Sequence, residues 1–458
     1  MTEEYKKQFI PNPKQLQLTN IAWQDPYVEN LLAFGPSRSG KSAILTALTV
    51  ARALAFPGTK HAIFRLTLRS CHSHLFHGTF PEIMDMLYPG YLDRSDVRVA
   101  KADNVVEFHN GSKIFFEGLD PTRIDKVLGA QYATAWINEC NEIDDYEIVQ
   151  QLASRMADTA PMIGGDGKPV IGPDGNIVMC RPLMLFDCNP DVKSDWEYQT
   201  FRLKQHPTSG KPFKDESKRK WRAVFLPAHE NAGNIAAGYL DALAERYDGS
   251  PNMASRFLEG RWRDDNPNAM FRKSMFQFKE VSRDFLVRIV VAVDPAGSSG
   301  NNSDYTGIVV VGIGFDGNAY VLEDASLQGT PEQWAKRVIT MYDNWEADMI
   351  VAEKNYGGEM VEHTIRTARK NVPVKMVNAS RGKLLRAEPV QMLYLQKKVF
   401  HTDSFKELEA QMCDYKPETK KSPDRMDALV WGLTELMKLN GQGAGGVTVT
   451  RSGGVWRR

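Results

Sequence analysis

The sequence predicts an α/β protein built from two successive domains, and three observations support this prediction. Between about Asn30 and Pro190, short apolar runs alternate with patterns of helical spacing, which is typical of a parallel sheet covered by helices. Residues 263–285 show no regular period, which places a domain boundary there. Residues 287–324 then contain three apolar runs joined by a loop and an Asp-Gly turn, which predicts antiparallel strands at the start of a second, mixed α/β domain.

Changes in composition and periodicity along the chain set the expected domain boundaries. We expect the first domain over residues 1–265, a linker over 266–285, the second domain over 286–439, and a flexible glycine-rich tail over 440–458. The composition is that of a globular protein. The sequence contains no run of about 18 apolar residues, so we expect no membrane-spanning helix, and its first residues do not have the apolar core of a signal peptide. Five scattered cysteines indicate free thiols in a reducing cytoplasm.

The charge is balanced, with 57 basic and 57 acidic residues. A protein that coats nucleic acid passively usually carries a basic excess, so the balance argues against such a coat. Any contact with DNA is therefore expected to be a local patch or a transient one.

The strongest local signal is the segment Gly35–Ser42, which matches the P-loop pattern G-x-x-x-x-G-K-S. An apolar run precedes it and a helical pattern follows, as a P-loop requires. Backbone N–H groups of such a loop wrap around phosphates, the lysine reaches the β- and γ-phosphates, and the serine binds Mg²⁺. ATP and Mg²⁺ are the expected ligands, and the residues expected to bind them are Gly35, Pro36, Ser37, Arg38, Ser39, Gly40, Lys41 and Ser42.

Polar residues at the ends of two further apolar runs are candidates for the rest of an ATPase site. Glu139 follows the run 132–137 and is placed to polarise the attacking water, while Asn138 stands where an aspartate is more usual. Asn189 ends the next run and is a candidate sensor of the γ-phosphate, although an ordinary Asn-Pro turn explains it equally well. Arg38 could neutralise charge on the transferred phosphoryl group, and Gln15 could read the adenine edge; a solvated arginine and a polar N-terminal arm are the alternatives.

The second domain presents carboxylates in a different pattern. Asp294 ends its first apolar run, Glu353 ends its fourth, and Asp424 and Asp427 open a late helix. Phosphodiester cleavage by two divalent ions needs such converging carboxylates, and oxygen ligands suit Mg²⁺ or Mn²⁺. The order of elements is that of an RNase H-like nuclease. Asp304 is a weaker candidate ligand, and helix capping or strand ends facing solvent are the alternatives.

The two halves together resemble the large terminase subunit of tailed bacteriophages, the motor that packages viral DNA. The resemblance rests on the segments Gly35–Ser42, 136–139, 188–190 and 257–262 and on the four carboxylates of the second domain. It implies that Lys41 and Ser42 bind Mg²⁺–ATP, that Glu139 is the catalytic glutamate, and that Asn189 lies in the motif that couples hydrolysis to movement. It also implies that Asp294, Glu353 and Asp424 hold the nuclease metals. The residue Asn138 departs from the acid usual in this family.

The resemblance further implies partners and a location. They are double-stranded DNA, the portal protein of a procapsid, a small terminase subunit, and copies of the same chain in a ring, a pentamer. The location is the host cytoplasm and, transiently, the portal vertex, but not the mature virion. Two other functions fit the motifs: a helicase-like repair ATPase fused to a nuclease, and a non-enzymatic, nucleotide-gated assembly adaptor.

Overall fold

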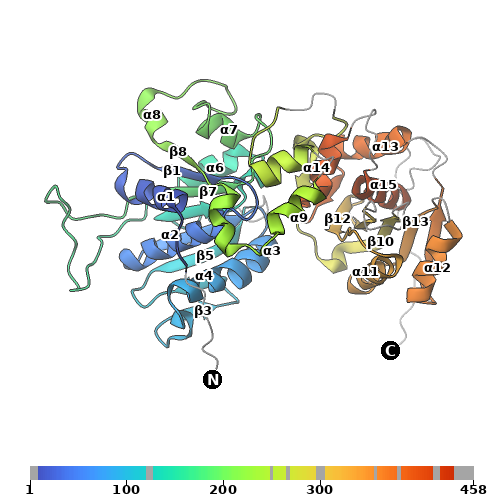
Figure 1. Cartoon of the computed structure of the whole chain (residues 1–458), viewed down its shortest axis with the longest axis horizontal. Helices are drawn as coiled ribbons and strands as arrows, with labels where there is room; N and C mark the ends of the chain where they lie inside the picture. The colour runs from blue at the N-terminus through green and yellow to red at the C-terminus, as the bar shows by residue number, and fades with distance from the viewer. Residues whose placement is uncertain are drawn as a thin grey trace. The chain divides into compact units, whose positions relative to one another are not determined.

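The computed structural model describes residues 9–119, 127–247, 251–264, 269–295, 305–354, 358–378, 383–415 and 423–437. The chain divides into two compact units, with the division between residues 265 and 266 (Figure 1). The candidate ligand Asp304 and the expected tail at 440–458 lie outside the described residues. In the described part of the chain, no helix is long and apolar enough to cross a membrane.

The N-terminal unit is built on an eight-stranded sheet in the order β3-β4-β5-β2-β6-β7-β1-β8. All neighbours from β5 to β8 are parallel, whereas β3 and β4 form an antiparallel edge. The prediction of a parallel sheet is therefore confirmed. The strands are β1 (Asn30–Phe34), β2 (Lys60–Arg65), β3 (Arg98–Ala100), β4 (Val105–Glu107), β5 (Lys113–Gly118), β6 (Thr134–Ile137), β7 (Leu183–Cys188) and β8 (Trp221–Phe225).

The strand order decides which side chains can meet in this unit. The strand β7 lies between β1 and β6, so the tip of β7 is flanked by the P-loop on one side and by Asn138 and Glu139 on the other. The first helix after the P-loop, α2 (Lys41–Ala55), packs against β2, β6 and β7 (Figure 1). The other helices are α1 (Pro13–Gln24), α3 (Leu68–Ser70), α4 (Phe80–Leu87), α6 (Tyr146–Ala153), α7 (Trp196–Phe201), α8 (Asp215–Arg219), α9 (Tyr239–Arg246) and α10 (Pro251–Ala254).

The C-terminal unit contains a seven-stranded sheet in the order β14-β13-β10-β11-β12-β15-β9. The strands β10, β11 and β12 are an antiparallel meander, and β13 and β14 follow in parallel on the other side of β10. This is the predicted order of an RNase H-like domain. The strands are β9 (Gln277–Phe278), β10 (Leu286–Asp294), β11 (Gly307–Gly314), β12 (Ala319–Asp324), β13 (Met349–Glu353), β14 (Val374–Val377) and β15 (Val399–His401).

Both faces of this second sheet are covered, which explains why its strands are apolar throughout. Val290 packs with residues of α15 (Asp424–Leu436) in one hydrophobic cluster, whereas its neighbour Val291 packs with α11 (Pro331–Asn344) in another. Successive residues of a strand point to opposite faces, so a continuous apolar run is needed. The remaining helices are α12 (Gly358–Ala368), α13 (Lys383–Leu395) and α14 (Lys406–Asp414).

Part of the segment expected as a linker belongs to this second core. Phe271 and Phe276 are almost fully buried in the cluster that contains α15, and β9 pairs with β15. The sequence of this segment has no period because its contacts come from single aromatic anchors and not from a long helix or strand. The described part of 266–285 is therefore packed structure of the C-terminal unit.

Candidate active sites

The P-loop joins β1, whose five residues are all buried, to α2. Gly40 is the N-cap of α2 and has φ 81° in the left-handed region, where glycine is favoured. A Cβ atom on Gly40 would lie 2.6 Å from Nε2 of Gln15, so a larger residue here would displace the Gln15 side chain. Because Gly40 has no side chain to cap the helix, N–H groups of the first turn can bind an anion.

The side chain of Lys41 is held inside this loop. It is 6% exposed, and its Nζ donates to the carbonyl oxygens of Pro36 at 2.7 Å and Gly35 at 3.1 Å. The same Nζ donates to Oδ1 of Asn189 at 2.8 Å, which connects the P-loop to the tip of β7. The structure thus brings together two residues that lie far apart in the sequence and that we expect at the γ-phosphate.

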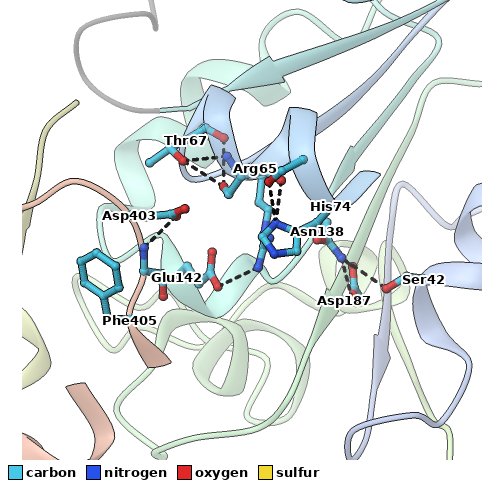
Figure 2. Close-up of polar contacts among 12 residues, drawn as sticks. Ser42, Arg65, Thr67, His74, Asn138, Glu142, Asp187, Asp403 and Phe405 are labelled. Carbon is cyan, nitrogen blue, oxygen red and sulfur yellow. Dashed lines mark hydrogen bonds and ion pairs between the residues drawn. The ribbon is translucent and has the colours of Figure 1, made fainter. Parts of the chain in front are cut away.

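A buried polar network lies at the ends of β6 and β7 (Figure 2). Ile137 is opposite Phe186 in the parallel register, so Asn138 and Asp187 lie side by side. Nδ2 of Asn138 donates to Oδ1 of Asp187 at 3.0 Å and to Oδ2 at 3.1 Å, and it lies 3.4 Å from Oγ of Ser42. The indole of Trp136 donates to Oδ1 of Asp187 at 2.8 Å.

The carboxyl group of Asp187 is fully buried. Burial, and then the negative charge of Glu139, raise the pKa of Asp187 to about 6, and the charge of Lys41 and the two side-chain donors counteract part of this rise. Both Glu139 and Lys41 are therefore close enough to act electrostatically on this carboxylate. Lys41, Glu139 and Asp187 thus share one electrostatic environment.

Glu139 has an unusual backbone conformation. Its φ and ψ are both 52°, and it begins the 3-10 turn Cys140–Glu142 directly after β6. A left-handed conformation costs a residue with a side chain energy, and such positions cluster at functional sites. The side chain of Glu139 is partly exposed at the strand end, where a catalytic glutamate is expected; its role stays a prediction.

Arg38 belongs to the P-loop, and Gln15 contacts the loop from α1. Arg38 is exposed, and its guanidinium lies 5.8 Å from the ring centre of Tyr239. Gln15 is 2% exposed; its Oε1 accepts from the N–H of Asn12, and its Nε2 donates to the carbonyl oxygen of Gly40 at 3.1 Å. The amide of Gln15 thus supports the P-loop in this structure, and a contact with adenine stays a prediction.

The segment 257–262 packs directly on the P-loop. The N–H of Ser37 donates to the carbonyl oxygen of Phe257 at 3.0 Å. Gly260 has φ 65°, and a Cβ atom there would lie 2.5 Å from the backbone nitrogen of Pro36. This close approach explains why a glycine occupies this position of the motif.

The carboxylates of the C-terminal unit converge at one edge of its sheet. β10 and β13 are parallel with Val293 opposite Ala352, so Asp294 and Glu353 end neighbouring strands. Asp294 is also opposite Gly307, and a Cβ atom on Gly307 would lie 1.9 Å from the carbonyl oxygen of Asp424. The first turn of α15 therefore sits directly over these strands. All four candidate ligands are nearly buried: Asp294 4%, Glu353 5%, Asp424 7% and Asp427 2% exposed.

A guanidinium group lies among these carboxylates. Nη1 of Arg386 is 3.6 Å from Oε1 of Glu353, and Nη2 is 4.0 Å from Oδ1 of Asp427. The guanidinium also lies 4.5 Å from the ring centre of Trp431, whose indole donates to Oε2 of Glu353 at 2.8 Å. Arg386 thus supplies positive charge to the carboxylates.

The ligand types at this edge, though not their present arrangement, suit a hard divalent ion. Buried carboxylates need a nearby positive charge, and carboxylate oxygens are the ligands that Mg²⁺ and Mn²⁺ prefer. In the described ranges, no group of three or more His, Cys, Asp or Glu side chains is arranged to hold a metal ion. Arg386 is the cation that the structure places beside Glu353 and Asp427.

Two family models match the chain. One, for the N-terminal part of the terminase large subunit, T4likevirus-type, matches residues 32–161, and the other, for the terminase RNaseH-like domain, matches residues 291–436. Together they cover more than half of the chain. It belongs to the large terminase family. The terminase therefore combines a parallel-sheet ATPase-type domain with an RNase H-like domain, and the predicted fold class is confirmed.

Solved structures of large terminases are similar to the chain at low sequence identity. The large terminase of a thermophilic bacteriophage is 15% identical with a TM-score of 0.46, and the match covers 93% of this chain and 99% of that chain. The HK97 bacteriophage large terminase is 10% identical with a TM-score of 0.40, covering 93% of this chain and 95% of that chain. No curated protein matches the terminase.

Two residues of the terminase sites were missed by sequence reasoning. Asp187 ends an apolar run in the same way as Glu139, and a search for an acid to replace the missing one at Asn138 would have found it. Arg386 has no such signal, because it belongs to a helical segment without a motif and reaches Glu353 only through the fold.

Proposed function

We propose that this terminase is a viral DNA-packaging motor. Its N-terminal unit hydrolyses ATP to move double-stranded DNA into a procapsid, and its C-terminal unit cuts concatemeric DNA with two Mg²⁺ or Mn²⁺ ions. The observation that carries the proposal is that one large terminase chain contains two kinds of site. In the first, Lys41 of the P-loop forms a hydrogen bond with Asn189 after β7; the second is the group of buried carboxylates at the strand ends of the C-terminal unit.

The contacts of the P-loop suggest how ATP is bound and hydrolysed. Phosphate oxygens would replace the carbonyl oxygens that Lys41 now contacts, and Mg²⁺ beside Ser42 would neutralise charge on the phosphates. Glu139 polarises the attacking water, and Arg38 stabilises charge on the transferred group. Asn189, just after β7, accepts a hydrogen bond from Lys41. Because Lys41 would also contact the γ-phosphate, loss of that phosphate would change the Lys41–Asn189 hydrogen bond and so couple hydrolysis to movement at the end of β7.

The carboxylate edge suggests how DNA is cut. Asp294, Glu353, Asp424 and Asp427 would hold the two ions, which together activate water and stabilise the leaving oxygen. Glu353 is oriented by the indole of Trp431.

The partners and the location belong to the same proposal. A large terminase needs a portal to push DNA through and a small terminase subunit to find the DNA, and a ring of copies of the chain, a pentamer, would act at the portal vertex in the host cytoplasm. The formal net charge of zero suits a motor that must grip and release phosphates repeatedly.

The nuclease part is tested with supercoiled plasmid, the full chain, and Mn²⁺ or Mg²⁺. The wild type is expected to cut only with metal, and an Asp294→Asn variant with the same circular dichroism spectrum is expected not to cut. Cutting by both proteins, or by neither, contradicts the assignment of the carboxylates.

The motor part is tested by DNA-stimulated ATPase activity and by strand displacement. Glu139→Gln is expected to bind ATP but to lose hydrolysis by a factor of about 100 or more. The wild type is expected to move along duplex DNA without separating its strands. Strand separation would favour a helicase-like enzyme, and a wild type that binds ATP but never hydrolyses it would favour a nucleotide-gated adaptor.

A further inference from the structure

The network at the ends of β6 and β7 points to a role for Asp187. The position after β6 that would carry an acid in the expected ATPase site holds Asn138, which has no charge. The neighbouring strand places a carboxylate beside this amide, because Asn138 and Asp187 follow paired residues of β6 and β7. A negative charge is therefore present in the site, but it is attached to the next strand.

The hydrogen bonds of Asp187 fix the orientation of Asn138. An ionised carboxylate only accepts hydrogen bonds, so Asn138 must turn its Nδ2 toward Asp187, at 3.0 and 3.1 Å from the two oxygens. Both oxygens of Asp187 therefore hold the amide nitrogen of Asn138 in place. Trp136 holds the other end of the arrangement by donating to Oδ1 of Asp187 at 2.8 Å.

The same network reaches the P-loop. Nδ2 of Asn138 lies 3.4 Å from Oγ of Ser42, the residue expected to bind Mg²⁺ (Figure 2). Asp187 is fully buried, and in a medium of low dielectric constant its charge acts over a longer distance than it would in water. Two residues after Asp187, Asn189 accepts from Lys41, so this strand end contacts the P-loop at a second point.

We propose that Asp187 is a positioning residue that supplies the negative charge missing at Asn138 and fixes the Asn138 amide beside Ser42, the residue expected to bind the Mg²⁺ of bound ATP. The inference rests on the proposed ATPase function and names a residue of that same site. A buried carboxylate with a merely structural role would affect folding but not the dependence of nucleotide binding on Mg²⁺.

The test is the binding of a fluorescent ATP analogue to the full chain, in Mg²⁺ and in EDTA. Asp187→Asn keeps the shape of the side chain, an acceptor for Trp136, and an amide that can pair with Asn138, but it removes the charge. We expect binding in EDTA to be unchanged and the Mg²⁺ concentration needed for half-maximal binding to rise by about 10-fold or more, the usual cost of removing a residue that supports a metal ligand.

Two further variants separate charge from structure. The exchange variant Asn138→Asp with Asp187→Asn returns one carboxylate to the pair and is expected to restore the wild-type Mg²⁺ dependence. Asn138→Asp alone would place two carboxylates side by side and should lower the melting temperature. Trp136→Phe removes a hydrogen bond to Asp187 but no charge, so it should raise the Mg²⁺ concentration needed for half-maximal binding less than Asp187→Asn does.

Each outcome is decisive. If Asp187→Asn folds and binds Mg²⁺–ATP like the wild type, the role of Asp187 is refuted while the ATPase proposal stands. If Asp187→Asn does not fold, the exchange variant decides. A folded exchange variant that needs a higher Mg²⁺ concentration than the wild type for half-maximal binding also refutes the role of Asp187. If the wild type itself does not bind ATP, the proposed function fails first.

Discussion

Replacing Arg386 by methionine should destabilise the C-terminal unit, because the buried carboxylates of Glu353 and Asp427 would lose a neighbouring positive charge. The two ion pairs of Arg386, at 3.6 and 4.0 Å, each contribute about 4 kcal/mol of Coulomb energy at an effective dielectric constant of about 20. Desolvation of the guanidinium offsets much of this energy, and breaking a buried pair usually costs about 3–5 kcal/mol. Methionine keeps an apolar contact with the ring of Trp431, so we expect a loss at the low end, about 3 kcal/mol.

The assay is thermal unfolding of the full chain without metal and with saturating Mn²⁺. For a domain of this size, about 3 kcal/mol lowers the melting temperature of the C-terminal transition by roughly 6–12 °C. Mn²⁺ can replace the lost positive charge, so the metal should stabilise Arg386→Met more than it stabilises the wild type.

A matched control comes from an exposed arginine of the same unit. Arg369 also combines an ion pair, with Asp343, and a ring contact, with Tyr342 at 5.4 Å. Its side chain is 43% exposed, so Arg369→Met should cost less than about 1 kcal/mol. The reasoning fails if the two variants lose equal stability, or if Mn²⁺ stabilises Arg386→Met no more than the wild type.

Three further predictions concern single positions. Gly260→Ala should weaken ATP binding, because its Cβ would collide with the P-loop and its φ of 65° disfavours alanine; nuclease activity measured on the same preparation should be unchanged. Gly307→Ala should abolish DNA cutting by pushing Asp424 away from the strands, while ATP binding persists; retained cutting would contradict the packing of α15. Burial lowers the pKa of His61 to about 3, below its ordinary 6.5, so the stability it contributes is complete above about pH 6.5 and falls by about 1.4 kcal/mol per pH unit as the pH drops toward 3. His61→Phe should flatten that part of an acid-unfolding curve, and an unchanged slope would refute the assignment.

Much of the fold could be predicted because strand ends are visible in the sequence. The apolar runs before Glu139 and Asp294 stop where the strands stop, because most residues of these two strands are buried. The P-loop was equally visible, because Gly40 and Lys41 are required by local backbone conformation and chemistry. These signals depend on residues that are close together in the chain.

What could not be predicted depends on residues that are distant in the chain. Asp187 lies beside Asn138 only because β7 pairs with β6, and Arg386 reaches Glu353 only through the packing of α13 in the C-terminal unit. The packing of Phe271, within the segment expected as a linker, has the same origin, because residues far along the sequence bury it. A charge in a motif can be found by pattern, but a charge supplied by a neighbouring element requires the topology.

The two sites of this terminase place different partners beside their buried charged groups. In the C-terminal unit, the buried carboxylates of Glu353 and Asp427 lie beside Arg386. In the N-terminal unit, the buried ammonium of Lys41 donates to the oxygens of Pro36 and Asn189 and acts on the buried carboxylate of Asp187. Neutral oxygens compensate a buried ammonium less well than phosphate does. We therefore expect each unit to gain stability when its proposed ligand binds, so that ATP and divalent metal raise the melting temperatures of different transitions in one full-length chain.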